Sequence, residues 1–599
     1  MVSRSSGKRS IKQSLQRKSK RGKSAQGATD AQSKGTSKRQ KSGRGKKGKG
    51  KATTAESDSL PVEELSPRQR LILERAAAKR RKETISFIAS TFFGCAFLAL
   101  LVGLFLEPKL GIAAGGALMC LVMAFKYQRL ALYAFLIYIP FSGTVTYALG
   151  GNSILQIAKD IFYIPALIGV YQFCQKNRLP IILPKAIKPP LIFLIIVVSL
   201  TALITNVPDQ IGQVNGKLPI VMAIWGAKIL FGYIPLVACI YYLIRNKEDL
   251  MWLLRMQAVL VLIVSALGFI QYFMLKTGMC QGTVGEAKEL FRASLQARCF
   301  VGGSLLYAPE VGQIRLPGTF VAPWQWGWFL ISGVFFSFGT SFNDEDFRWR
   351  IVGLASLVAL FTMALVSGQR IALVMVPLLF GSLMIITKQY ANLKKFLPVG
   401  VLLALVVSYL IVNNPEVVTT RVNSLMSRWE ASPPQQFVTE QFSQVWDKQE
   451  GLFGKGVGRA TNSARTFGKT VLIETYHPKL IYELGPIGLF AVMAMYTTLT
   501  VVTFRVYRKT KDKSLRGYAA TMWFFIFFIS YFPYYYPLDV DPVGVYYWLA
   551  AGIILKIPAL EQQEKDKLAE LNQPPDSPAL TAKDRRRRAR LNKEVPTFE

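Results

Sequence analysis

The chain contains a single histidine, His477, and its surroundings suit acid–base chemistry. Pro478 follows it, and because proline favours the first turn of a helix, we predict that His477 lies close to a helix N-cap. The N-terminus of a helix presents unpaired N–H groups and a partial positive charge, which favour the neutral imidazole and attract phosphate. A neutral His477 beside a bound phosphate could therefore act as a general base.

Four arginines are predicted to lie on the same side of the membrane as His477, and they are candidate phosphate ligands: Arg315, Arg370, Arg421 and Arg428. The planar guanidinium group offers five donors that match phosphate oxygens. Arg315 and Arg370 fall at the ends of predicted spans, where the alternative is that they extend toward lipid headgroups. The set predicts an anion-binding surface more strongly than any one member does.

Two short motifs suggest other chemistry. The glycine-rich run at 451–458 could hold a phosphate through its backbone amides, although it lacks the Lys-Ser/Thr ending of a Walker A loop. Asp539 and Asp541 form the Asp-X-Asp pattern with which some glycosyltransferases hold a divalent ion. Because so short a match arises easily by chance, we predict neither a metal site nor a cofactor.

The elements that position these residues are predicted to be membrane-spanning helices. Of 599 residues, 51% are hydrophobic and 18% are charged, and the apolar residues gather in stretches that approach the ~20 residues needed to cross a bilayer. This pattern predicts an all-α, polytopic integral membrane protein with about fourteen transmembrane helices. We place them at 84–106, 110–126, 129–149, 154–174, 190–205, 219–244, 252–275, 323–340, 350–367, 371–387, 396–413, 478–504, 517–536 and 543–557.

The basic residues indicate the orientation of the chain. Lys and Arg concentrate in alternate loops and in both tails, so the positive-inside rule places the N- and C-termini in the cytoplasm. Two long loops, 276–322 and 413–477, then face outward, and function is expected there because loops on a rigid scaffold commonly carry it. Tyr534, Tyr535 and Tyr536, at an outer helix end, are typical of an interfacial aromatic belt.

Two of the six cysteines, Cys280 and Cys299, fall in the first outward loop, whereas the other four lie in predicted spans. An outward loop faces an oxidising compartment, which favours disulfide formation. We predict a disulfide between them. The alternative is two free thiols.

The net charge of +37 is unevenly spread, because the first 51 residues hold eighteen Lys or Arg and a single acid, Asp30. This Ser-, Gly-, Lys- and Arg-rich segment lacks a hydrophobic core, so the N-terminal tail is predicted to be disordered. Basic tails are predicted at 1–83 and 558–599, on either side of a transmembrane domain at 84–557. A basic tail attracts anionic lipids. Nucleic acid is not the expected partner, because no aromatic platform or recognition helix interleaves the charges.

Several of these stretches, taken in order, resemble the O-antigen ligase and O-antigen polymerase family of bacterial membrane proteins. The segment 315–323 resembles its Arg-x-x-Gly-Thr-Phe-x-Asn-Pro pattern, and 367–370 is similar to its Ser-Arg-Gly turn. The run 452–458 resembles its Leu-Phe-Gly-x-Gly-x-Gly run, and 477–489 resembles its histidine signature. The resemblance covers about 315–489, including the large predicted periplasmic loop at about 413–477.

The resemblance implies a glycosyltransferase of the bacterial inner membrane that needs no metal. It would move a glycan from undecaprenyl pyrophosphate to a hydroxyl of a lipid or glycan acceptor on the outer face, as in lipopolysaccharide biosynthesis. Arg315 and Arg428 would bind pyrophosphate, and Arg370 and Arg421 would support them. His477 would orient or deprotonate the acceptor, and Glu483 would support the local helix geometry.

The main alternative is a transporter of a small anion such as bicarbonate, since some relatives in this family have been named for carbon uptake. It would use Lys159, Asp160 and Lys228, which are costly inside a membrane unless they are paired or hydrated. The sequence has no clear internal repeat, which weakens this alternative. The same three residues would otherwise form a buried structural lock.

Overall fold

The computed structural model describes residues 67–150, 158–212, 218–284, 298–309, 313–392, 400–401, 404–405, 408–409, 412–413, 415–535 and 537–571. The chain divides into two units, Met1–Lys79 and Arg80–Glu599. The described part of the first unit is the beginning of one helix. All of the contacts discussed below lie within the second unit.

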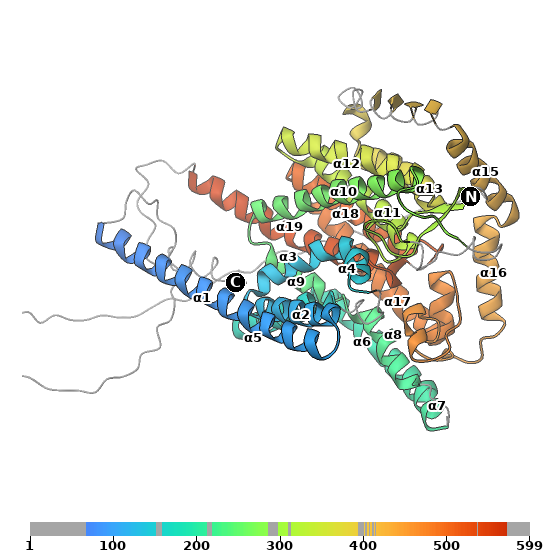
Figure 1. Cartoon of the computed structure of the whole chain (residues 1–599), viewed down its shortest axis with the longest axis horizontal. Coiled ribbons are helices and arrows are strands. Elements are labelled where there is room, and N and C mark those ends of the chain that lie inside the picture. Colours follow the sequence, from blue (N-terminus) through green and yellow to red (C-terminus); the bar gives the residue numbers. More distant parts are fainter. Residues whose placement is uncertain are drawn as a thin grey trace, which may run out of the picture. The chain divides into compact units, whose positions relative to one another are not determined.

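Helices make up most of the described chain (Figure 1). The helices are α1 (Pro67–Phe105), α2 (Pro108–Lys126), α3 (Gln128–Tyr138), α4 (Ser142–Ala148), α5 (Asp160–Asn177), α6 (Lys188–Thr201), α7 (Val207–Gly212), α8 (Pro219–Phe231), α9 (Leu236–Leu243), α10 (Lys247–Lys276), α11 (Pro323–Asn343), α12 (Phe347–Val366), α13 (Arg370–Ile386), α15 (Pro415–Ala431), α16 (Pro434–Trp446), α17 (Tyr476–Lys509), α18 (Lys513–Tyr531) and α19 (Val543–Leu571).

The protein is a multi-pass membrane protein. Among the described residues, nine helical segments are long and apolar enough to cross a membrane, and the shorter α13 is apolar as well. Helices suit this environment because they satisfy their backbone hydrogen bonds internally. Three further helices, α5, α11 and α18, lie at the predicted spans 154–174, 323–340 and 517–536. The predicted span 396–413 lies mostly outside the described residues, so the count of fourteen stays a prediction.

Two helices continue past the predicted limits of the transmembrane domain at 84 and 557, and these limits stay predictions. Helix α1 begins at Pro67, inside the predicted tail 1–83, and α19 continues to Leu571, beyond the predicted end of the transmembrane domain at 557. Both extensions are rich in Ala, Leu, Glu, Lys and Arg, which are strong helix formers, so a polar sequence does not end the helix. The rest of both predicted tails lies outside the described residues.

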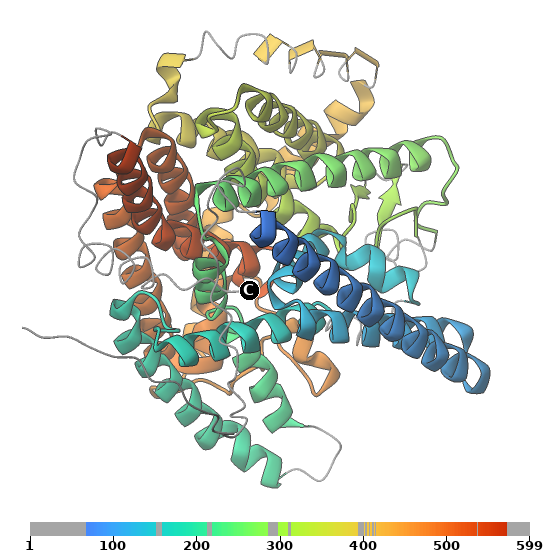
Figure 2. The same ribbon diagram turned by 90° about the vertical axis from the view of Figure 1, so that its left-hand side faces the viewer.

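Helices α1 and α2 form a hairpin and lie side by side (Figure 2). Small residues allow their close approach. A Cβ atom added at Gly111 would lie 2.3 Å from the carbonyl oxygen of Ala99, and one at Gly115 would lie 2.6 Å from the Ala99 side chain. Gly111 and Gly115 are four residues apart, so they lie on one face of α2. Small residues at this spacing let two helix backbones approach closely within a membrane.

The core is centred on α11, which packs against α10, α12, α13 and α18. Its side chains are buried along almost its whole length. Aromatic rings fill the contacts with α18 and α19. The ring centroids of Phe335 and Phe525 are 4.8 Å apart, and those of Phe336 and Tyr546 are 5.1 Å apart. These buried rings fix how the C-terminal helices sit against α11, and α17 packs against both α18 and α19.

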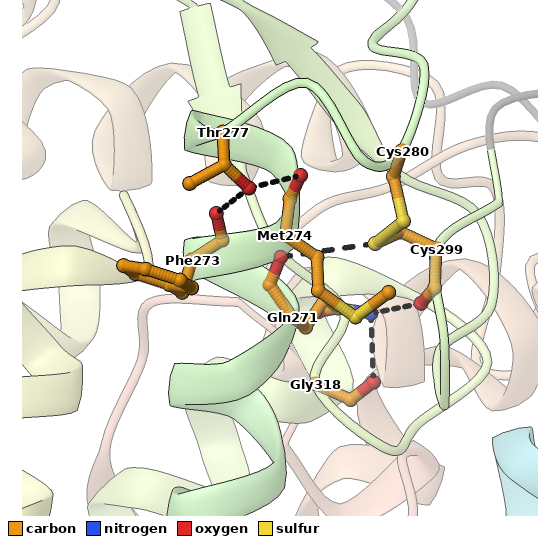
Figure 3. Close-up of a disulfide and its surroundings, with 7 residues drawn as sticks. All are labelled: Gln271, Phe273, Met274, Thr277, Cys280, Cys299 and Gly318. Carbon is orange, nitrogen blue, oxygen red and sulfur yellow. Dashed lines mark hydrogen bonds between the residues drawn. A yellow bond between two sulfur atoms is a disulfide. The ribbon is translucent and has the colours of Figure 1, made fainter.

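Within the described residues, the first predicted outer loop contains the two β-strands. Strands β1 (Leu306–Ala308) and β2 (Gln313–Arg315) pair antiparallel, with Leu306 opposite Arg315. Beside them, Cys280 and Cys299 form the disulfide that the sequence predicts, with their Cα atoms 5.5 Å apart. The Gln271 side chain of α10 donates to the carbonyl of Cys299 at 2.9 Å and to that of Gly318 at 3.4 Å (Figure 3). One glutamine thus ties the disulfide to the segment that follows Arg315.

The disulfide should protect both cysteines from alkylation. In membranes treated with a thiol-reactive maleimide under native conditions, we expect Cys280 and Cys299 to react only after a reductant is added. In the chain-entropy model, closing a loop of about twenty residues stabilises the fold by ~3 kcal/mol, so the Cys280→Ser, Cys299→Ser double variant should unfold at a lower temperature. A Cys120→Ser variant is the control. Labelling of both cysteines before reduction would contradict the prediction.

Candidate functional site

His477 is the second residue of α17, as its sequence position beside Pro478 predicts. The side chain is only 8% exposed, and its Nε2 atom has no hydrogen-bond partner among the residues that the structure describes. The backbone of Ser530, in α18, acts electrostatically on the ring. Because Nε2 is unpartnered, a hydrogen bond to the Ser530 carbonyl would come from Nδ1. In that neutral tautomer, Nε2 is left as a proton acceptor.

The residue that precedes α17 is also incompletely bonded. Thr475 is the N-cap and is fully buried, but its side chain makes no capping hydrogen bond, and its Oγ1 atom has no partner within the described part of the chain. Most buried polar atoms in proteins are hydrogen-bonded, so each exception requires an explanation. Two such atoms within three residues, at the positive end of a helix, indicate a place where a polar ligand or water is bound.

Helix α17 is broken at Gly485, where φ is +76° and ψ is −179°. Pro486 follows and has no N–H, so it cannot donate to the carbonyl of Tyr482, four residues earlier. The glycine-rich run supplies the missing donors. The N–H of Lys455 donates to the Tyr482 carbonyl at 2.7 Å, and the N–H of Gly456 donates to the Glu483 carbonyl at 3.3 Å.

This arrangement gives the glycine-rich run a structural role. The next amide in the run, that of Val457, donates to the side chain of Asn206 at 2.9 Å, and Asn206 in turn donates to the Val457 carbonyl at 3.1 Å. Three successive amides of the run are therefore engaged with the protein. The hypothesis that these amides hold a phosphate is not supported by this geometry.

Glu483 binds the same loop through its side chain. One carboxylate oxygen accepts from the N–H of Ala460 at 2.7 Å and from the hydroxyl of Thr461 at 3.0 Å, and Lys479 lies 3.9 Å from the other oxygen. Glu483 is 5% exposed. Through these contacts the buried carboxylate holds the loop 454–461 against the first half of α17, and the supporting role in catalysis stays a prediction.

The structure brings the segments of Arg315 and Arg370 together. Arg315 ends β2 and is exposed, and Arg370 begins α13. The N–H of Leu316 donates to the carbonyl of Ser367 at 3.0 Å, which joins the two segments. Arg315 also acts electrostatically on the hydroxyl of Tyr535. Because the Tyr535 carbonyl accepts from the N–H of Tyr476 at 2.9 Å, Arg315 lies in the neighbourhood of the start of α17.

The other two predicted arginines, Arg421 and Arg428, lie in α15. Their side chains are outside the described residues. The structure therefore neither joins them to His477 nor separates them from it.

The two aspartates of the Asp-X-Asp pattern are each paired with a lysine. Asp539 forms an ion pair with Lys479, and Asp541 forms one with Lys159 and accepts from the hydroxyl of Tyr233 at 3.3 Å. A lysine ammonium beside each carboxylate competes with a metal ion for its oxygens. In the part of the chain that the structure describes, no group of three or more His, Cys, Asp or Glu residues is placed to hold a metal.

Lys228 and Asp160 form a further ion pair, so the three intramembrane charges that the sequence singles out are all partnered. Pairing offsets much of the cost of placing charges in a membrane. The Lys159–Asp541 pair joins the start of α5 to the segment before α19, and the Lys228–Asp160 pair joins α8 to α5. This is the arrangement that the structural-lock interpretation predicts.

Sequence reasoning missed several residues at this site, namely Thr475, Ser530, Tyr535 and Asn206. Asn206 offers a signal in retrospect, because it is a polar residue at the end of the apolar stretch 190–205. Ser530 contributes only its backbone carbonyl, which no residue pattern reveals. Tyr535 belongs to the predicted aromatic belt, and its contact with α17 is made by its backbone carbonyl, which no residue pattern reveals.

Neither a model of a known protein family nor any curated protein matches this chain.

Proposed function

We propose that the protein is a glycosyltransferase that moves a glycan from undecaprenyl pyrophosphate to an acceptor hydroxyl at the predicted outer face of a bacterial inner membrane. The observation that carries the proposal is the state of His477: a buried imidazole at a helix N-terminus whose Nε2 atom is an acceptor without a partner among the described residues. A general base needs this arrangement before its substrate arrives. The acceptor is a lipid or a glycan.

In the proposed reaction, the acceptor oxygen forms a bond to the anomeric carbon of the glycan while the bond from that carbon to the carrier phosphate breaks. The hydroxyl proton passes to Nε2 of His477, and the electron pair leaves with undecaprenyl pyrophosphate. Arg315 and Arg370, with Arg421 and Arg428 as further candidates, would stabilise the charge that develops on this leaving group. Because guanidinium groups supply the positive charge, the proposal requires no metal.

The test is a transfer assay with the purified full-length protein in lipid nanodiscs. The donor is an undecaprenyl-pyrophosphate oligosaccharide, and the acceptors are a lipid-linked core glycan and a second copy of the donor. We expect a longer glycan product and free undecaprenyl pyrophosphate, formed at the same rate with and without EDTA. A control reaction omits the acceptor.

Two results would overturn the proposal. In the first, neither acceptor gives a product, and membranes that overproduce the protein show no change in their glycans. In the second, sealed vesicles that contain the protein take up bicarbonate, and vesicles with the Lys228→Ala variant do not. This result would establish the transporter alternative. Loss of activity with EDTA would show that the mechanism depends on a metal.

A further inference from the structure

Tyr535 adopts a backbone conformation that is costly for a bulky residue. It follows α18, and its φ is +61°, in the left-handed region that favours glycine and asparagine. Strained residues of this kind persist where the surrounding structure holds them, and they cluster at functional sites. Asparagine or glycine would adopt this conformation at lower cost, so the aromatic ring itself is expected to have a role.

The strained backbone connects Tyr535 to the start of α17. Its carbonyl oxygen accepts from the N–H of Tyr476 at 2.9 Å, and Tyr476 is the residue between Thr475 and His477. Tyr476 is therefore flanked by the two residues with unpartnered buried atoms, Thr475 with Oγ1 and His477 with Nε2. Any ligand that satisfies these atoms must lie close to the segment at Tyr535.

Three aromatic rings form a corner here, which we define as Phe437, Tyr534 and Tyr535. The Tyr534 and Tyr535 rings are nearly perpendicular with centroids 4.5 Å apart, and Phe437 of α16 lies 5.5 Å from Tyr534. All three side chains are half-buried. The side chain of Gln441, also in α16, accepts from the N–H of Glu474 at 3.1 Å. The aromatic corner is thus held by a helix of the large loop, which distinguishes it from a belt that faces only lipid.

Charged groups of both signs surround the aromatic corner. Arg315, Glu474 and Tyr534 all act electrostatically on the Tyr535 hydroxyl. Half-buried rings with hydroxyl groups, a carboxylate and a guanidinium suit a ligand that has apolar C–H faces and several hydroxyls. A sugar ring meets this description. An acyl chain does not, because it would leave the charged groups without partners.

We propose that the aromatic corner binds the terminal sugar of the acceptor and presents its reacting hydroxyl to Nε2 of His477. A hydroxyl both donates and accepts, so a sugar can donate to Nε2 of His477 through one hydroxyl and accept from Oγ1 of Thr475 through another. This inference rests on the proposed transferase function. It adds that the acceptor is recognised through a sugar ring rather than through a lipid chain.

The test compares Tyr534→Ala and Tyr535→Asn with Tyr390→Phe, a conservative change at an exposed aromatic outside the corner. Asparagine tolerates a positive φ, so Tyr535→Asn keeps the backbone and its carbonyl while removing the ring. Initial rates are measured against acceptor concentration at saturating donor, and then against donor concentration. Each corner variant should raise the KM for the acceptor by about tenfold, the upper end of what an aromatic contact contributes, with little change in the KM for the donor.

A thermal unfolding measurement separates recognition from folding. Tyr535→Asn relieves backbone strain but also removes the contacts of a half-buried ring, so the two effects oppose each other and only a small change in unfolding temperature is expected. If both corner variants keep the wild-type KM for the acceptor, the aromatic corner does not bind the sugar and the inference is overturned, while an active wild type leaves the proposed function intact. A rise in the KM for the donor alone would also overturn it. No activity in the wild type would instead refute the proposed function.

Discussion

Replacing His477 with alanine is expected to reduce kcat for glycan transfer by about 10²- to 10⁴-fold, the usual contribution of a general base. The imidazole is the acceptor for the proton that leaves the attacking hydroxyl, and no other histidine exists in the chain to replace it. The reaction is followed by chromatography of a fluorescently labelled acceptor. Addition of free imidazole should restore part of the lost activity in the alanine variant, because the vacated space is beside the reacting hydroxyl.

The matched control for this substitution is His477→Gln. Glutamine is similar in volume, and its amide can still donate to the Ser530 carbonyl, but it cannot take up a proton. We expect His477→Gln to fold and insert as the wild type does and to lose as much activity as the alanine variant. If His477→Gln retains the wild-type rate, then the ring acts through its hydrogen bonds alone and the general-base assignment is wrong.

Replacing Gly485 with alanine should strongly destabilise the fold. The new Cβ atom would lie 2.1 Å from the carbonyl oxygen of Leu452, which is backbone and cannot rotate away. The left-handed conformation adds a penalty of its own for any side chain. Together these effects should cost roughly 3 kcal/mol or more, enough to deplete the folded protein in the membrane.

The control for Gly485→Ala is Gly381→Ala in α13. A Cβ atom at Gly381 would have no atom within 4 Å, so alanine there should stabilise the helix slightly or leave it unchanged. Both variants are purified in detergent, and unfolding is followed by the reaction of buried cysteines with a fluorogenic maleimide during heating. Equal unfolding temperatures for the two variants would show that the backbone at Leu452 moves to accommodate the new Cβ atom. The break in α17 would then not be rigid.

Features encoded locally could be predicted from the sequence. The start of α17 follows from Pro478, and the Cys280–Cys299 disulfide follows from which cysteines lie outside the apolar stretches. The break at Gly485 was not predicted, although the Gly-Pro pair is a recognised break signal, because the apolar residues on both sides continue the pattern of a single span. Periodicity reports where a helix can form, and it does not report whether its hydrogen bonds are continuous.

Features that depend on distant parts of the chain could not be predicted. Lys479 pairs with Asp539, sixty residues away, so a pattern that resembled a metal site in isolation becomes half of an ion pair in the fold. The same limit applies to the aromatic corner, where Phe437 and Tyr534 come from segments nearly a hundred residues apart. In each case the sequence contains the residue types, but it does not indicate which distant residues they contact in the fold.

The dependence of α17 on the run at 451–458 limits how this protein can be recombined with others. A chimera that receives α17 alone would leave the carbonyl of Tyr482 without a donor inside a lipid environment, where an unsatisfied backbone group costs several kcal/mol. A graft that carries 451–489 as one block would bring its own donors, and a host that supplies an asparagine at the position of Asn206 would complete the block. The loop and the helix are therefore one transplantable module, and homologous exchange between such proteins should keep its crossover points outside it.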